Sequence, residues 1–152
     1  MVRVEEATEA TPEVVEAMQR LVPQVSSSAP LPTAEDVAAI VASPATVLLI
    51  ARTDDATIAG TLTLALFRIP TGMRAWIEDV VTDRGAQRQG IGTALTREAL
   101  RRAAAAGART VDLTSRASRE DANRLYQKLG FERRDTNVYR TELGTPSGML
   151  SV

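Results

Sequence analysis

The strongest constraint on the fold is a strand, a glycine-bearing loop, a helix and a second strand that follow one another along the chain. The strand-like segment 74–82 ends at Asp83, apolar residues at helical spacing cover 91–106, and 110–115 again has the pattern of a strand. Strand, helix and strand in this order predict a parallel pair joined by a right-handed crossover. The chain is therefore expected to build an α/β sheet that contains at least one parallel pair.

The rest of the sequence adds antiparallel strands and further helices to this unit. Strands are predicted at 2–7, 46–53 and 58–69, helices after the capping residues Thr11, Thr33 and Ser118, the last of them ended by Gly130, and a closing hairpin from 131–134 and 137–143. The expected order is β-α-α-β-β-β-α-β-α-β-β, a mixed central sheet with flanking helices. One domain over residues 1–143 and a tail over 144–152 are expected.

The composition restricts the chemistry that the chain can perform. Its 152 residues include no Cys and no His, which excludes thiol nucleophiles, Ser-His-Asp triads and His-ligated metals, so no metal site is expected. The net charge of −1 lacks the basic excess of a nonspecific nucleic-acid binder. Without a signal-peptide pattern or a run of membrane-spanning length, the sequence predicts a cytoplasmic protein that binds neither nucleic acid nor membrane.

The loop that precedes helix 91–106 has the features of an anion site. Gly90 and Gly92 would let the backbone approach a ligand at a helix N-terminus, where free N–H groups and the helix dipole favour negative charge. Gly92 is followed by Thr-Ala, so this is no Walker A loop, and Leu95 replaces the third glycine of a dinucleotide fingerprint. A plain connection between strand and helix remains the alternative.

Two motifs carry a resemblance to a known family. The segment 87–92, QRQGIG, matches the signature [RQ]-x-x-G-x-[GA], and the segment 122–131, ANRLYQKLGF, resembles the same family's later helix with its Leu-Gly-Phe turn. Together with the element order, these motifs resemble the GNAT superfamily of acyl-CoA-dependent N-acetyltransferases over essentially residues 2–143. Arg88 departs from the pattern, because many members carry Gly at that position.

The resemblance implies acetyl-CoA as the donor, an amine as the acceptor and a possible homodimer. In the family, the central strand and the next strand splay apart, and the pantetheine arm of the donor lies along the opened edge. The donor-binding residues that the resemblance implies are Val80, Val81 and Thr82 on that edge, Gln87, Arg88, Gln89, Gly90, Ile91, Gly92 and Thr93 around the pyrophosphate, and Asn123 on the last helix.

Acetyl transfer also requires a base, an acid and a donor to the developing oxyanion. An amine with a pKa near 10.4 is neutral in fewer than about one molecule in a thousand at pH 7, so it must lose a proton before attack. Glu78, in an IED context similar to that of glucosamine-phosphate N-acetyltransferases, is the expected base, acting through a water. Tyr126 is the expected acid, and the Val81 N–H the expected oxyanion donor.

Ordinary structural roles remain open for both catalytic candidates. Strand alternation predicts Trp76, Glu78 and Val80 on one face and Ile77, Asp79 and Val81 on the other. Glu78 is alternatively a solvated or ion-paired strand residue. Tyr126 is alternatively a core residue that packs on Phe131 in a Schellman motif at the end of its helix.

The expected enzyme acetylates a small-molecule amine, an amino acid or a protein amino group, and two further functions compete with it. A non-catalytic module that binds acyl-CoA as a sensor or partner would share the same loop, but the presence of both Glu78 and Tyr126 favours the enzyme. An acetyltransferase directed at tRNA would be expected to carry a basic face, which the net charge of −1 disfavours.

Overall fold

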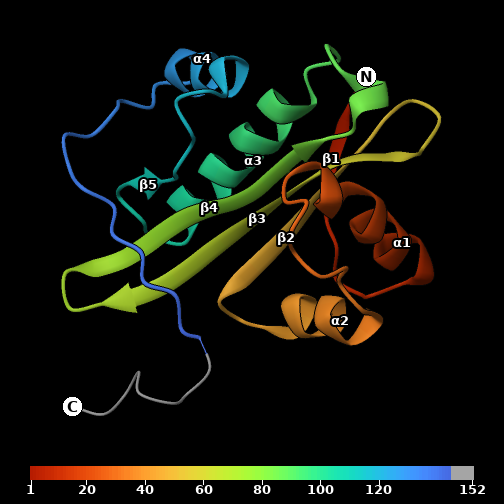
Figure 1. The fold of residues 1–152 in the computed structure, drawn as a ribbon, viewed down its shortest axis with the longest axis horizontal. Helices are drawn as coiled ribbons and strands as arrows, with labels where there is room; N and C mark the ends of the chain where they lie inside the picture. Colours follow the sequence, from red (N-terminus) through yellow and green to blue (C-terminus); the bar gives the residue numbers. More distant parts are fainter. Residues whose placement is uncertain (145–152) are drawn as a thin grey trace.

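A single five-stranded sheet runs through the computed structural model, which describes residues 1–144 (Figure 1). Its strands, in spatial and sequence order, are β1 (Arg3–Glu6), β2 (Thr46–Arg52), β3 (Ile58–Ile69), β4 (Gly72–Thr82) and β5 (Val111–Asp112). The first four pair antiparallel, and β5 pairs parallel with β4. The predicted mixed sheet, with its parallel pair at the end of the α/β unit, is confirmed.

The helices cover the two faces of this sheet. They are α1 (Pro12–Leu21), α2 (Ala34–Ala42), α3 (Ile91–Ala105) and α4 (Glu120–Lys128), with short 3₁₀ turns η1 (Val22–Gln24) and η2 (Arg84–Ala86). Buried residues of α3 pack with one face of the sheet, and those of α1 and α2 pack with the other. The predicted caps are confirmed: Thr11 accepts a hydrogen bond from Val14 N, and Thr33 forms a capping box with Asp36.

The first turn of α3 is held tightly against the sheet at Gly60 of β3. A Cβ at Gly60 would lie 2.5 Å from Ile91 Cγ2 and 3.0 Å from the Val81 carbonyl oxygen. Ile91 is itself almost fully buried, and it begins α3 directly after the glycine-bearing loop. Only a residue without a side chain fits between this helix start and the sheet.

Replacing Gly60 by Ala is expected to lower the free energy of unfolding by about 1–3 kcal/mol, because the added methyl overpacks a filled site. Urea denaturation of both proteins measures the effect. Gly85→Ala is the matched control, since no heavy atom lies within 4 Å of a Cβ at Gly85. Equal stability of the Gly60→Ala variant and the unmodified protein would contradict this packing.

A bulge in β4 reverses the side-chain alternation that the sequence predicted. Between the pairs that Glu78 and Val81 make with β3, the register shifts by one residue, and Asp79 has a positive φ of 49°. As a result Val80 packs with Ile77 on the α3 face, whereas Val81 packs on the α1 face. The predicted grouping of Val80 with Glu78, and of Val81 with Ile77, is wrong because the bulge adds a residue to the strand.

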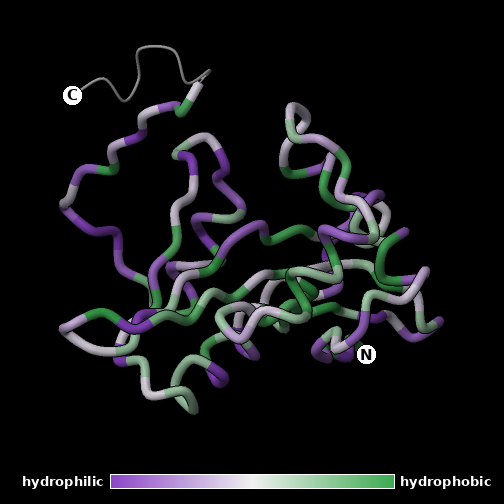
Figure 2. The backbone as a smooth tube through the Cα atoms, turned by 90° about the horizontal axis from the view of Figure 1, so that it is seen from below, coloured by the Kyte–Doolittle hydropathy of each residue, from purple (hydrophilic) through white to green (hydrophobic). Residues whose placement is uncertain are grey.

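The C-terminal part of the described chain differs most from the prediction. The expected strand 110–115 shrinks to two residues, and the closing hairpin from 131–134 and 137–143 is wrong, since residues 131–144 form no strand. Figure 2 shows this segment standing apart from the sheet and mostly hydrophilic. A hairpin that buries no apolar face gains too little free energy to form.

The start of the last helix also differs from the prediction. The last helix begins at Glu120 with Arg119 at the N-cap position, so the predicted capping role of Ser118 is wrong. Apart from Gly144, the predicted tail 144–152 lies outside the described residues. No helix among residues 1–144 combines the length and the apolar character that crossing a membrane requires.

Candidate functional site

The edge of β4 beside β5 is open over half its length. β5 pairs with β4 only at Ala75 and Trp76, whereas β4 continues to Thr82. Within the described part of the chain, the backbone from Ile77 onward therefore has no strand partner on that side. An edge of this kind presents backbone hydrogen-bonding groups to an extended ligand.

The loop between β4 and α3 has the backbone that the glycine pattern predicted. Gly90 is the N-cap residue of α3 and has a left-handed φ of 75°. Gln87 folds back, and its Nε2 donates to the Thr82 carbonyl oxygen at 3.4 Å. The residues from Gln87 to Gly90 are exposed, while Ile91 anchors the following turn in the core. The free N–H groups of the helix start are thus held at a fixed place beside the end of β4.

Arg88 also has a left-handed backbone, with a φ of 66°. A residue with a Cβ is disfavoured in this region, whereas Gly adopts it freely. This conformation explains why glycine is common at the position in the family that the sequence resembles.

Arg88→Ala is expected to be about 0.5–1 kcal/mol less stable than Arg88→Gly, because only alanine opposes the left-handed backbone. Both variants remove the guanidinium, so their difference isolates the backbone conformation. Chemical denaturation of the pair measures it. An alanine variant as stable as the glycine variant would show that this loop is not left-handed in solution.

Three parts of the site meet at Gly92. A Cβ at this residue would lie 3.2 Å from Leu125 Cδ1 of α4 and 3.7 Å from Thr82 Oγ1 of β4. The first turn of α3, the end of β4 and the middle of α4 therefore converge on one point. Both motifs of the sequence analysis are brought together there.

Tyr126 lies in the last turns of α4, at the position that the sequence predicted. The Phe131 N–H donates to the Tyr126 carbonyl oxygen at 2.9 Å, the Gly130 N–H donates to that of Gln127 at 3.1 Å, and Gly130 has a positive φ of 97°. This is the predicted Schellman motif. The Tyr126 and Phe131 rings meet edge-on, with centroids 5.7 Å apart.

Tyr126 is largely buried. The residue is 9% exposed, and its ring packs against Phe131. Burial raises the pKa of the phenol, and the nearby charge of Arg119 opposes that rise only in part. The group is therefore fully protonated at neutral pH.

Asn123 holds the loop that leads into α4. Its side-chain amide donates to the carbonyl oxygens of Arg116 at 2.8 Å and Arg119 at 2.7 Å. These bonds occupy the Nδ2 group, which leaves Oδ1 for other partners. The contact with the donor that the resemblance implied for Asn123 stays a prediction.

A hollow of about 170 Å³ lies at the end of β4. It is lined by Gln24, Val25, Val80, Val81, Thr82, Arg84, Gln87 and Arg119. Four of these residues were predicted to bind the donor, whereas Arg88, Gln89, Gly90, Ile91, Gly92 and Thr93 lie outside the lining. The lining carries two guanidinium groups and no carboxylate, in a chain of net charge −1. The hollow therefore favours an anionic ligand.

Sequence reasoning missed Gln24, Val25 and Arg119. The first two follow α1 in a Ser/Pro-rich stretch, and η1 with its C-cap Val25 places them beside the end of β4. Arg119 lies directly before α4 and reaches the hollow only through the tertiary fold. No local motif marks any of the three.

Glu78 lies on β4, on the open part of the strand. It is exposed, as is its neighbour Asp79 at the bulge. No ion pair to either carboxylate is found in the part of the chain that the structure describes, whereas Arg74 of the same strand pairs with Asp112. This removes the ion-paired alternative for Glu78 and leaves a solvated residue or a base.

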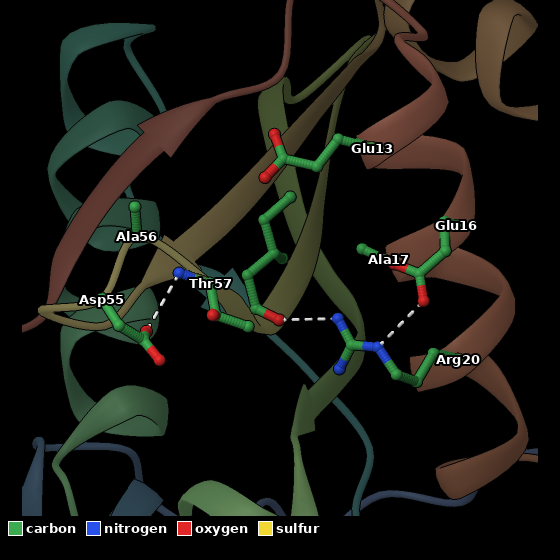
Figure 3. A pocket seen from close by; sticks show the side chains of 8 residues that line it. Glu13, Glu16, Ala17, Arg20, Asp55, Ala56 and Thr57 are labelled. Carbon is green, nitrogen blue, oxygen red and sulfur yellow. Dashed lines mark hydrogen bonds and ion pairs between the residues drawn. The ribbon is translucent and has the colours of Figure 1, made fainter.

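A second hollow, of about 300 Å³, lies between α1 and the β2–β3 turn (Figure 3). Its acidic side chains already have partners: Glu13 pairs with Arg52, Glu16 with Arg20, and Asp55 accepts from Thr57 N. It contains none of the predicted site residues. Residues 1–144 include no group of three or more carboxylates arranged to hold a metal ion.

Comparison with known proteins agrees with this geometry. Residues 13–131 match the model of a family described as acetyltransferase (GNAT). The fold is similar to a transcriptional regulator from Bacillus halodurans C-125, at 26% identity over 93% of this chain and 100% of that one, with a TM-score of 0.77. A comparison with curated proteins gave no match.

Two further solved structures share the fold at lower identity. A putative acetyltransferase from Agrobacterium tumefaciens is 22% identical over 92% of this chain and 99% of that one, with a TM-score of 0.80. An aminoglycoside acetyltransferase from an uncultured soil metagenomic sample is 19% identical over 93% and 97%, with a TM-score of 0.77. Since the family match spans most of the sequence, from α1 to the turn after α4, the chain belongs to the GNAT acetyltransferase family.

Proposed function

We propose that the protein is an N-acetyltransferase that moves an acetyl group from acetyl-CoA to an amine by direct attack in a ternary complex. The observation that carries the proposal is the hollow at the end of β4. It joins Val80, Val81 and Thr82 of the open strand edge to Gln87 of the glycine-bearing loop, and its only charges are cationic. A ligand that is extended at one end and polyanionic at the other fits this combination.

The donor would lie with its pantetheine arm along the open edge of β4 and its pyrophosphate at the start of α3. Backbone N–H groups from Arg88 to Thr93 would hold the phosphates, aided by the helix dipole. Arg84 of η2 and Arg119, which directly precedes α4, line the hollow and add positive charge. The cavity alone is too small for the whole donor, so most of it would lie along the surface.

The acceptor amine would be deprotonated on the Glu78 side and the leaving thiolate protonated on the Tyr126 side. Glu78 takes a proton from the ammonium through a water, and the freed nitrogen lone pair forms the new bond to the acetyl carbon. As the carbon–sulfur bond breaks, the Tyr126 hydroxyl gives its proton to the sulfur, and the second proton that the acylated nitrogen loses restores the phenol. The acid form of Tyr126 suits neutral pH, because burial raises the pKa of its phenol.

A cationic amine is the acceptor class that the residues favour. Glu78 and Asp79 stand side by side on the exposed part of β4, without an ion-pair partner in residues 1–144. A carboxylate-bearing acceptor would be repelled there. The similar fold described as an aminoglycoside acetyltransferase is consistent with this class, although at 19% identity it bears on the fold alone.

Thiol release is the direct test. Acetyl-CoA is mixed with the protein and a panel of amines, amino acids and peptides, and a thiol-reactive dye follows free CoA. The chain has no Cys and gives no background. A parallel thermal shift measures donor binding, since ligand at a hundred times its Kd stabilises by about 2.7 kcal/mol. Release with one acceptor class establishes the enzyme, and neither release nor stabilisation would reject the proposal.

A non-catalytic acyl-CoA-binding module is the second candidate. The observation that favours this module is the similar structure described as a transcriptional regulator, at 26% identity. Stabilisation by acetyl-CoA without thiol release from any amine would favour this module over the enzyme. A homodimer and a cytoplasmic location are further proposals, and light scattering of the purified protein would test the first.

A further inference from the structure

We infer that Arg20, Gln24 and Asp83 form a positioning cluster that sets the shape of the donor site from the α1 side of the sheet. The inference rests on the proposed function, because it names residues that act on donor binding without contacting the reacting atoms. None of the three belongs to the glycine-bearing motif or to the catalytic pair.

Asp83 is the centre of the cluster. It directly follows β4, and its backbone N–H donates to the Ala59 carbonyl oxygen at 2.8 Å. One carboxylate oxygen accepts from Arg20 Nη1 at 2.5 Å, and the other accepts from Gln24 Nε2 at 3.3 Å. The same second oxygen lies 3.4 Å from the Gly85 N–H that it caps. The carboxylate thereby ties the entrance of the loop to α1 and η1 at once.

Gln24 links this carboxylate to the loop backbone. While its Nε2 donates to Asp83, its Oε1 accepts the Arg84 N–H at 3.0 Å. Its own side chain also lines the hollow, together with that of Arg84. Loss of this amide would leave the Arg84 N–H without its partner and remove part of the hollow's wall.

Arg20 fixes the cluster to the sheet. Its Nη2 donates to the Ile58 carbonyl oxygen of β3 at 2.9 Å, and its Nε contacts Glu16 at 3.3 Å (Figure 3). The Arg20 and Asp83 side chains are 33% and 25% exposed, whereas Glu16 is 64% exposed. The bond to Asp83 is therefore the better shielded of the two ion pairs and the harder to replace by water.

These contacts affect donor binding because they hold the junction between the two parts of the donor site. They fix residues 83–85, which connect the open edge of β4 to the segment 87–92 that would hold the pyrophosphate. A shift of this junction would change the alignment of both parts of an extended ligand. The cluster should therefore act on donor affinity and leave the chemical step unchanged.

The test compares Gln24→Ala and Arg20→Lys with the matched control Glu16→Gln. Calorimetry measures the Kd of free coenzyme A, and steady-state kinetics with an accepted amine give kcat and the KM for acetyl-CoA. We expect Gln24→Ala to raise both Kd and KM about fivefold or more, which is the effect of losing one hydrogen bond. Arg20→Lys keeps the charge but cannot reach both acceptors, and a smaller rise is expected. Glu16→Gln should match the unmodified protein.

A fall in kcat per molecule with unchanged Kd and KM would indicate a purely structural role and overturn the inference. So would an unchanged Kd in Gln24→Ala, or an equal rise in Glu16→Gln. Thermal unfolding of each variant confirms that it is folded before binding is measured. If the unmodified protein binds no coenzyme A, the proposed function falls and this inference with it. If it binds coenzyme A and the variants bind equally well, only the inference falls.

Discussion

Replacing Tyr126 by Phe is expected to lower kcat by about 10²–10³-fold, within the usual range for loss of a general acid. The donor's thiolate would then leave without a proton from the enzyme. The hydroxyl is also the only atom removed, so the Kd of acetyl-CoA should stay within about twofold, well below a tenfold change that 1.4 kcal/mol would give. Steady-state kinetics and calorimetry on the same preparation separate the two quantities.

The fold should tolerate this substitution, which makes the kinetic result interpretable. A Phe ring at position 126 keeps the edge-on contact with Phe131 and lacks only the hydroxyl. Tyr139→Phe is the matched control, because that ring is 88% exposed and lies far along the C-terminal segment. Unchanged turnover in Tyr126→Phe, or an equal loss in Tyr139→Phe, would remove Tyr126 from the mechanism.

The pH profile gives a second measure of the same group. Burial raises the pKa of Tyr126 above the ordinary value of about 10 for a phenol, so its acid form persists to higher pH. Activity that depends on this acid is present below the raised pKa and is lost as pH rises through it. The unmodified enzyme should therefore show no loss of kcat from this group between neutral pH and about pH 10.

Local signals in the sequence predicted the parts of the site that depend on backbone conformation. Gly130 ends α4 because its left-handed backbone completes the Schellman motif, and Gly90 begins α3 in the same left-handed region. Thr33 and Asp36 form the capping box that their spacing favours. Each of these depends on residues within a few positions of one another, so the sequence alone contains the physical cause.

Features that depend on distant parts of the chain could not be read in this way. The bulge at Asp79 follows from the pairing of β4 with β3, and no residue type near it requires a left-handed backbone. Gln24 reaches Asp83 across 59 positions of sequence, and Arg119 reaches the hollow from the loop before α4. The closing hairpin predicted at 131–134 and 137–143 does not form, because a strand is stabilised only where one face packs against other residues, and that packing cannot be read from the local sequence.

Replacing Glu78 by Gln is expected to lower kcat about 10²–10³-fold at neutral pH, because the ammonium then loses its base. The defect should shrink as pH rises, since each unit below the amine's pKa makes the neutral amine about tenfold more abundant. The variant's log kcat/KM should thus rise with a slope near one up to about pH 10, where the amine itself titrates. A pH series with the acceptor identified by thiol release measures this slope.

Asp79→Asn separates the base from the local negative charge. Asn tolerates the left-handed backbone at position 79, so this variant removes a neighbouring charge and keeps the bulge. It should raise the KM for a cationic amine through the lost attraction while keeping kcat and the shape of the pH profile. If Asp79→Asn acquires the steep pH dependence and Glu78→Gln does not, then the bulge has placed the other carboxylate against the amine, and Asp79 is the base.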